Sequence, residues 1–354
     1  MGKSILRYGL GLDISKKDFQ ACIAKVLESN EEKIIASKKF SNTPAGFALF
    51  IEWIIKNKKQ KELSLRILME VTGVYHENLL HHLFESGFEV VLETGKRVKR
   101  FKEMLGYKSK NDKLDAKAIT IMACRNYGKL WSPISKHIIQ IRTALRHRKA
   151  LIAKRVQCAN QLEALLHSKY PFKEIEKSLK KMIKMLKSET QAIEKKAFEF
   201  AARDKEMLEK VKMIVDSVKG LGMLTVLTVV AETNGFHDFR NSKQLVSYAG
   251  YDIVENQSGS FMGKTKISKK GNAQIRTILH MGSVSVIRFK IEPFYDFYIR
   301  LLKRNGRIKK KAMVAVQRKL LILIYTLWNK NEAFDISYYK QIENKELEME
   351  LEKV

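Results

Sequence analysis

The chain has 354 residues, with 67 lysines and arginines against 38 aspartates and glutamates, which gives a formal net charge of +29 with histidine neutral. Hydrophobic residues make up 45% of the sequence, enough for buried cores, so a wholly disordered basic protein is excluded. A folded protein with this charge requires a polyanionic partner, and nucleic acid is a better candidate than an anionic membrane surface.

The N-terminal residues 1–130 predict an α/β domain. Asn42 or Thr43 can cap a helix that starts at Pro44, because proline suits the first turn. Strands that are followed by helices indicate a mixed sheet with parallel pairs. The predicted strands cover residues 5–14, 19–26, 33–40, 65–69 and 89–92, and the other predicted helices cover residues 75–86 and 113–126.

Residues 131–216 change in character, because residues 134–216 lack glycine and are interrupted only by Pro171. Apolar residues recur every seven positions, which is typical of coiled coils. A helical hairpin within one chain and a dimer between two chains remain equally open interpretations. The repeat consists of Ile138, Leu145, Ile152, Ala159 and Leu166, and then of Leu179, Leu186, Ile193, Phe200, Met207 and Ile214.

Residues 217–331 predict a third, mainly helical domain. A Gly-Leu-Gly turn at residues 220–222 precedes an apolar helix at residues 224–231, and a second apolar helix at residues 311–328 closes the domain. The remaining residues 332–354 form an acidic tail to which we assign no chemistry.

Cysteine usage and the N-terminus indicate the compartment. The three cysteines, Cys22, Cys124 and Cys158, are far apart and form no Cys-x-x-Cys pair, so a zinc ribbon is excluded and a disulfide framework is disfavoured. We expect no signal peptide, because a strand-like segment starts directly after the first residues. The longest apolar run covers residues 320–328 and is too short to span a bilayer. We therefore expect a reduced, cytoplasmic location and no membrane partner.

Four carboxylates are candidates for chemistry. Asp13 lies inside a strand pattern and Glu70 ends another strand, positions where a carboxylate is costly to bury without a cation or donors. For Asp13, an outward position on an edge strand is an equally good explanation. Asp112 and Asp115 are three residues apart, which places both on one face of a helix, although the helix dipole alone favours acids in a first turn.

Together these four carboxylates are more informative than each is alone. Clustered carboxylates repel one another and need divalent cations, and hard oxygen ligands select Mg²⁺ or Mn²⁺. Two such ions, about 4 Å apart, stabilise the attacking and leaving oxygens of phosphoryl transfer. An acidic cluster in a strongly basic chain therefore indicates an enzyme that binds nucleic acid and acts on its phosphodiester.

Basic residues gather in three runs, at residues 96–113, 264–276 and 303–319. A run of charge is usually only a solvated face, but these runs are poorly balanced by acids and suit contacts with a phosphate backbone. The candidate nucleic-acid contacts are Lys96, Arg97, Lys99, Arg100, Lys108, Lys110, Lys264, Lys266, Lys269, Lys270 and Arg276. Ser258, in the segment Gln-Ser-Gly-Ser at residues 257–260, is by spacing alone best explained as part of a polar turn.

Taken in order, the motifs resemble those of transposases of the IS110 and IS1111 insertion-sequence group, over nearly the whole chain. The stretch where many relatives show Asn-Pro is Glu-Thr-Gly at residues 93–95, and residues 248–252 lack the common proline. Neither departure touches a candidate chemical residue. The motifs are Gly-Leu-Asp-Ile-Ser at 11–15, Glu-Val-Thr-Gly-Val-Tyr at 70–75, Lys-Ser-Lys-Asn-Asp-Lys-Leu-Asp-Ala at 108–116, Gly-Leu-Gly at 220–222, Phe-Arg-Asn-Ser-Lys-Gln-Leu at 239–245, Tyr-Ala-Gly at 248–250, Gln-Ser-Gly at 257–259 and Ile-Ser-Lys-Lys-Gly-Asn at 267–272.

The resemblance implies a RuvC-like, RNase H-type fold for the first domain. It also implies an Asp-Glu-Asp-Asp metal cluster, which falls on Asp13, Glu70, Asp112 and Asp115, with two Mg²⁺ or Mn²⁺ ions, and a serine nucleophile, which falls on Ser258. The family is similar in using a structured guide RNA that pairs with donor and target DNA. A prokaryotic, nucleoid-associated homo-oligomer, either a dimer or a tetramer, is expected.

Three functions remain open at this point. The first is a DNA recombinase with covalent serine chemistry. The second is a metal nuclease of the junction-resolvase type, in which water attacks the phosphorus. The third is an architectural nucleic-acid-binding protein, for which the basic runs would suffice. The resemblance favours the first.

Overall fold

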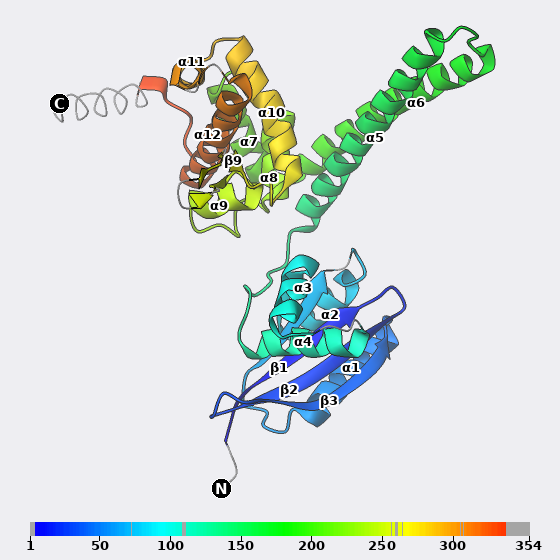
Figure 1. Cartoon of the computed structure of the whole chain (residues 1–354), viewed down its shortest axis with the longest axis vertical. Helices are drawn as coiled ribbons and strands as arrows, with labels where there is room; N and C mark the ends of the chain where they lie inside the picture. The colour runs from blue at the N-terminus through cyan, green and yellow to red at the C-terminus, as the bar shows by residue number, and fades with distance from the viewer. Residues whose placement is uncertain are drawn as a thin grey trace, which may run out of the picture. The chain divides into compact units, whose positions relative to one another are not determined.

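The computed structural model describes residues 4–71, 73–107, 111–255, 257–258, 261–263, 265–304, 306 and 308–337. Two compact units divide the chain, Met1–Pro133 and Ile134–Val354, and each is described by itself (Figure 1). Within the described residues, no helix is long and apolar enough to cross a membrane.

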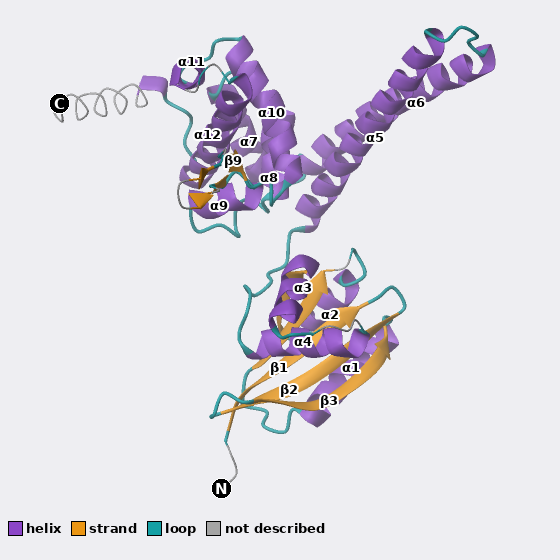
Figure 2. Ribbon diagram, viewed as in Figure 1, coloured by secondary structure: helices purple, strands orange, loops and turns teal. Residues whose placement is uncertain are grey.

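The N-terminal unit is built on a five-stranded sheet with the strand order β3-β2-β1-β4-β5. The first three strands are antiparallel, and β4 and β5 run parallel to the central strand β1 (Figure 2). This mixed α/β topology confirms the RuvC-like, RNase H-type fold predicted from the sequence. The strands are β1 (Ile5–Ile14), β2 (Asp18–Leu27), β3 (Glu32–Ser41), β4 (Leu65–Val71) and β5 (Glu89–Thr94).

Two pairs of helices cover the two faces of this sheet. Helices α1 (Pro44–Asn57) and α2 (Glu77–Glu85) pack with the face that carries Leu10 and Leu12 of β1. Helix α1 starts as predicted, because the Thr43 hydroxyl accepts a hydrogen bond from the Gly46 amide at 3.3 Å. Helices α3 (Gly95–Met104) and α4 (Asp112–Cys124) pack over the opposite face.

The C-terminal unit begins with a long helical hairpin of α5 (Lys136–Leu166) and α6 (Lys173–Ala201), which pack against each other (Figure 1). Leu145 and Leu186 of the seven-residue repeat are buried, whereas Leu166 is half exposed. The repeat also crosses a helix break, because its last two members lie on α7 (Lys205–Ser217). Pairing of this hairpin with another chain stays a prediction.

The rest of this unit is mainly helical, as predicted. Helix α8 (Met223–Glu232) is buried from Thr225 onwards and lies in the core with α10 and α12. Two small hairpins, each of two-residue strands, join α9 to α10. The remaining elements are α9 (Ser242–Ala249), β6 (Ile253–Val254), β7 (Gln257–Ser258), β8 (Phe261–Met262), β9 (Lys266–Ile267), α10 (Ala273–Arg288), α11 (Phe294–Arg304) and α12 (Lys309–Lys330).

Candidate active site

The sheet register places acidic residues in one row at the carboxyl ends of the parallel strands. The pairing of β1 with β4 runs to Leu12 and Met69, and the next residues are Asp13 and Glu70. On the other side of β4, Glu70 pairs with Glu93 of β5. Because paired residues project from the same face, the three carboxylates share the face that α3 and α4 cover. Strand β1 is central, so an edge-strand position for Asp13 is wrong.

Two glycines on β1 set the position of α4 over this face. A Cβ at Gly11 would lie 2.3 Å from the Thr120 amide nitrogen and 2.6 Å from the Ala116 carbonyl oxygen, and one at Gly9 would lie 2.6 Å from the Cys124 nitrogen. The backbones of β1 and α4 are therefore in contact, and the two elements run in opposite directions, since Gly9 lies against Cys124 and Gly11 against Thr120 and Ala116. The next residue of β1 on this face is Asp13, and it therefore faces the first turn of α4.

That first turn carries the other two predicted acids. Asn111 caps it, since its side chain accepts a hydrogen bond from the Leu114 amide at 2.8 Å. Asp115 is buried, with 7% of its surface exposed. Asp112 begins the helix, and its side chain lies outside the described residues. The topology thus brings the backbone of both aspartates to the row that Asp13 and Glu70 begin.

Glu70 lies against the start of α3. Its Oε1 is 2.6 Å from the position that a Cβ on Gly95 would occupy, so the carboxylate fills a space that only glycine leaves open. Gly95 is the first residue of α3, and the dipole at a helix N-terminus favours a carboxylate. The Gly-x-Gly pattern at residues 9–11 and the glycine at the strand–helix junction could have indicated these contacts from the sequence.

The donors suit a hard divalent cation. Asp115 Oδ1 is buried next to the Lys102 ammonium, at 2.7 Å, without a well-directed hydrogen bond, and the acids here offer only carboxylate oxygens, the ligands that such ions prefer. Among the described residues, no group of three or more His, Cys, Asp or Glu side chains is arranged to hold a metal ion. The side chain of Asp112, the fourth acid of the predicted cluster, lies outside the described residues and is therefore not one of these side chains.

Glu93 is an acid that the sequence analysis did not assign a role. It is 3% exposed and forms an ion pair with Arg97, at 2.8 Å between Oε1 and Nη1. Burial raises the pKa of the Glu93 carboxyl above its ordinary value of 4.5, and the Arg97 guanidinium opposes the shift. The place of Glu93 opposite Glu70 follows from the register of β4 with β5, which the sequence alone does not give.

The raised pKa of Glu93 predicts a pH effect on stability. The folded state keeps this proton over a pH range in which the unfolded chain has lost it, so folding is progressively opposed as pH rises from about 4.5 to the folded pKa. We therefore expect the melting temperature of wild type, minus that of Glu93→Gln, to fall across this window and then stay constant. Thermal melts in chelator over a pH series measure it. A difference that rises with pH would contradict the burial argument.

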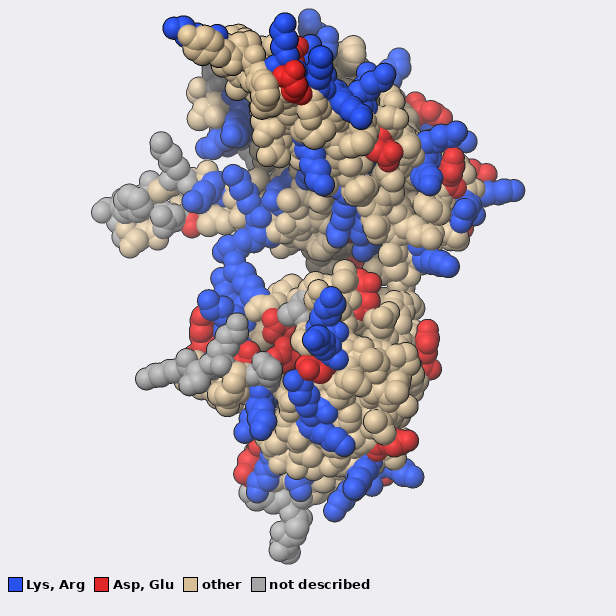
Figure 3. Space-filling view, turned by 90° about the vertical axis from the view of Figure 1, so that its right-hand side faces the viewer, with Lys and Arg blue, Asp and Glu red and all other residues tan. Residues whose placement is uncertain are grey.

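The first basic run forms a helix that the sequence analysis did not predict. Lys96, Arg97, Lys99 and Arg100 all lie on α3, next to the acidic row. In Figure 3 one group of acidic side chains on the N-terminal unit has basic side chains beside it, while other acidic side chains are scattered over the same face. Lys108 and Lys110 lie outside the described residues.

Ser258 lies in the other unit, on an exposed hairpin. It is exposed on β7 and pairs with Phe261 of β8. The strands β6 and β9 pair at the base of this segment, where Lys266 is exposed. Lys264 lies outside the described residues. After β9, Lys269 and Lys270 are exposed, and Arg276 of α10 donates a hydrogen bond to the Ala249 carbonyl at 2.8 Å.

An ionic network around the buried Glu232 holds the end of this segment, and sequence reasoning did not find it. Glu232, which is 3% exposed, accepts two hydrogen bonds from Arg146 of α5, both at 2.7 Å. It also accepts one from Asn272 Nδ2 at 2.7 Å, while the Asn272 side chain caps α10. Glu232 therefore ties the long helical hairpin to the loop that follows β9.

Loss of this network should lower stability. We expect Glu232→Gln to reduce the free energy of unfolding by about 2 kcal/mol, because Arg146 loses its charged acceptor but remains half exposed to water. Denaturant unfolding measures the change. The control is Glu206→Gln, which removes an exposed partner of Lys210 and should leave the midpoint unchanged. Equal effects of the two substitutions would contradict the role of burial.

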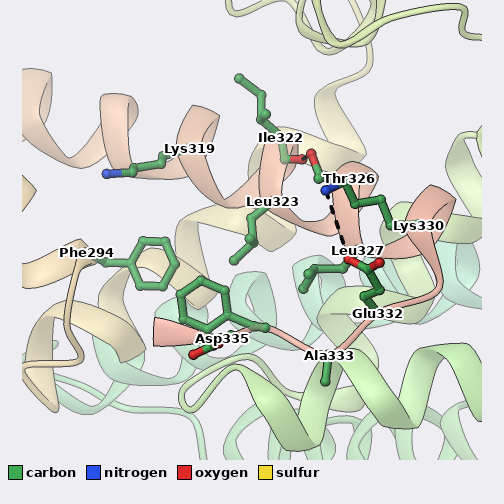
Figure 4. A pocket seen from close by; sticks show the side chains of 11 residues that line it. Phe294, Lys319, Ile322, Leu323, Thr326, Leu327, Lys330, Glu332, Ala333 and Asp335 are labelled. Atoms are coloured by element: carbon green, nitrogen blue, oxygen red, sulfur yellow. Dashed lines mark hydrogen bonds and ion pairs between the residues drawn. The ribbon is translucent and has the colours of Figure 1, made fainter. Parts of the chain in front are cut away.

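The C-terminal unit also contains an apolar cavity of about 590 Å³, between α11, α12 and the segment after α12. Figure 4 shows Phe294 and Leu323 facing its interior, with Lys330 and Glu332 at its edge. None of the predicted site residues lines it, so we assign it no part in the chemistry.

Comparisons with known proteins identify the chain. A family model for the DEDD-type transposase of IS110, described as a transposase, matches residues 10–171. A second model, described as the transposase of the IS116/IS110/IS902 family, matches residues 212–299. The chain belongs to the IS110 family of transposases. As an IS110-family transposase it is an enzyme that acts on DNA, and its DEDD-type domain implies dependence on a divalent metal ion.

Relatives of this transposase include a gene-inverting protein. The pilin gene-inverting protein of Moraxella bovis is 24% identical over 327 residues, covering 92% of this chain and 97% of that protein. The transposase for insertion sequence element IS1111A of Coxiella burnetii is 31% identical over 123 residues, covering 34% of this chain and 33% of that protein. RuvC from T. thermophilus, in complex with a Holliday junction substrate, matches with a TM-score of 0.27 and 13% identity, over 35% of this chain and 99% of that one.

Proposed function

We propose that this IS110-family transposase cuts and rejoins DNA through Ser258, assisted by two divalent cations, Mg²⁺ or Mn²⁺, bound by Asp13, Glu70, Asp112 and Asp115. The observation that carries the proposal is the acidic row at the carboxyl ends of β1 and β4, facing the first turn of α4. When bound, two such ions would neutralise charge on the phosphate and on the oxygens that exchange.

The covalent step is a transesterification. The Ser258 oxygen forms a bond to phosphorus, the bond from phosphorus to a deoxyribose oxygen breaks, and a proton passes through a base from the serine hydroxyl to the departing oxygen. Rejoining reverses these changes with a different DNA end. A serine hydroxyl is a poor nucleophile by itself and needs such activation. The exposed position of Ser258 on its hairpin gives a phosphodiester access to it.

The acidic cluster and Ser258 belong to different units, and we propose that the working site is shared between protomers of a dimer or tetramer. The long hairpin of α5 and α6 would make the contact, through apolar side chains exposed near its tip, such as Leu166, Tyr170 and Phe172. Mixing a Ser258→Ala chain with an Asp13→Asn chain tests the arrangement. We expect the mixture to cleave DNA strands more than either variant alone, and no increase in cleavage would contradict the shared site.

We further propose that a structured guide RNA, encoded by the element, pairs with donor and target DNA, and that the complex works at the nucleoid in the prokaryotic cytoplasm. The large positive charge supports this, since DNA and a folded RNA are two polyanions to bind at once. Purification of the protein with its nucleic acid, followed by sequencing, tests the idea. One discrete non-coding RNA from the flank of the gene is expected, and random cellular RNA would contradict it.

A second candidate is a metal nuclease of the junction-resolvase type, in which water attacks the phosphorus. One observation favours it: the row of Asp13 and Glu70 and the first turn of α4 all lie in the N-terminal unit, so the acids need nothing from Ser258 to assemble. This candidate predicts free cleaved ends and activity that survives loss of Ser258.

A further inference from the structure

A lysine on α3 contacts Asp115 of α4, whose first turn faces the acidic row. Lys102, in the last turn of α3, places its ammonium 2.7 Å from Oδ1 of Asp115 on α4. The two side chains are 18% and 10% exposed, so this ion pair is largely shielded from water, unlike the pair of Lys99 with Glu103 on the same helix, which is 76% and 62% exposed.

The pair has an unusual geometry. Although the ammonium is close, Asp115 Oδ1 has no hydrogen-bond partner, so the contact is one of charge without a well-directed hydrogen bond. An ionised carboxylate that is buried needs a compensating cation, and Lys102 supplies it. At the same time, an oxygen without a hydrogen bond keeps a lone pair for another ligand.

We propose that Lys102 is a resident counter-cation of Asp115, which stabilises the acidic row without a metal ion and weakens the binding of a divalent cation. The inference rests on the proposed function, because it takes Asp115 to be a metal ligand. The ammonium is a compact charge on a flexible four-carbon stem, so it can withdraw when a doubly charged ion arrives. Until then, the positive charge of Lys102 repels the divalent cation, and this repulsion is strong because the pair is largely shielded from water.

Neutral replacement of Lys102 should therefore have opposite effects on the metal-free and metal-bound protein. We expect Lys102→Met to bind Mn²⁺ at least about ten-fold more tightly than wild type, because one repelling charge is gone. Without metal, the same variant should melt at a lower temperature, since Asp115 is left buried without a cation. Its melting temperature should then rise more than that of wild type when Mn²⁺ is added.

Calorimetric titration of the full-length protein with Mn²⁺, and thermal melts with and without it, measure these quantities independently of DNA cleavage. Lys99→Met is the matched control, because it removes the same charge from an exposed position of the same helix and should bind Mn²⁺ as wild type does. Lys102→Gln is a second neutral variant that can still donate a hydrogen bond to Asp115, and it should also bind Mn²⁺ more tightly.

The outcomes separate the inference from the proposed function. If wild type binds Mn²⁺ and Lys102→Met and Lys102→Gln bind it no more tightly than Lys99→Met, the role of Lys102 is wrong while the metal cluster stands. If wild type binds no Mn²⁺, the metal cluster itself is wrong, and the inference falls with it. A Lys102→Met protein that folds only in Mn²⁺ supports the counter-cation, and one that stays unfolded with Mn²⁺ contradicts it.

Discussion

Ser258→Ala should abolish the covalent protein–DNA adduct and lower the rate of recombination by at least about a thousand-fold. Loss of a nucleophile that acts together with its activating groups removes most of their combined contribution, which is why such substitutions have very large effects. Ser258 is exposed on a two-strand hairpin, so removing one oxygen should leave the fold and DNA binding intact. Denaturing gels with labelled DNA detect the adduct, and strand-transfer assays give the rate.

The matched control is Ser260→Ala, two residues further along the same Gln-Ser-Gly-Ser segment. It should retain both adduct and recombination, because the Gln-Ser-Gly pattern falls on Ser258. If the adduct persists in Ser258→Ala and disappears in Ser260→Ala, the nucleophile has been assigned to the wrong serine. If neither variant loses cleavage and only free ends are produced, water is the nucleophile and the resolvase-type mechanism is correct.

The acidic row was largely predictable from the sequence because its placement follows from simple rules. A carboxylate at the carboxyl end of a parallel strand lies at one edge of the sheet, so the positions of Asp13 and Glu70 along their strands sufficed to bring them together. Their register with Glu93 could not be predicted, since it depends on how β4 and β5 align. The metal-binding role of the four predicted acids still rests on the proposal.

Helix α3 was not predicted because its composition is typical of a solvent-exposed loop. Only Val98 and Phe101 are buried among its ten residues, and most of the others are charged. A basic run that suits phosphate binding was recognised, but its helical form was not. That form is what brings Arg97 to Glu93 and Lys102 to Asp115, so the pairs that surround the acidic row were missed with it.

The Glu232 network could not be predicted for a different reason. Its partners Arg146 and Asn272 lie 86 and 40 residues away along the chain, and each is an ordinary polar residue in its own segment. Similarly, the seven-residue repeat identified long helices, but local spacing did not reveal that the repeat continues past the end of α6 onto α7. Contacts between distant segments depend on tertiary packing, which a local pattern does not record.

Gly11→Ala should unfold or strongly destabilise the N-terminal unit and also reduce activity. The new Cβ would lie 2.3 Å from the Thr120 amide nitrogen and 2.6 Å from the Ala116 carbonyl oxygen, and both are backbone atoms of α4 that cannot rotate away. Helix α4 must therefore move, and we expect the free energy of unfolding to fall by about 3 kcal/mol. Because α4 carries Asp112 and Asp115, a shift of about 1 Å should cost on the order of a hundred-fold in cleavage.

Gly222→Ala is the control, because a Cβ at that position meets no atom within 4 Å. It should leave cleavage close to that of wild type and lower the melting temperature only slightly, because alanine is a poorer N-cap for α8 than glycine. Measurements on the fraction of Gly11→Ala protein that still folds separate loss of the fold from loss of the site. In this fraction the Mn²⁺ affinity should fall together with the cleavage rate if α4 supplies metal ligands. Normal Mn²⁺ binding and normal cleavage in a destabilised Gly11→Ala protein would mean that the contact of β1 with α4 supports the fold alone, and that the acids on α4 do not act with Asp13 and Glu70.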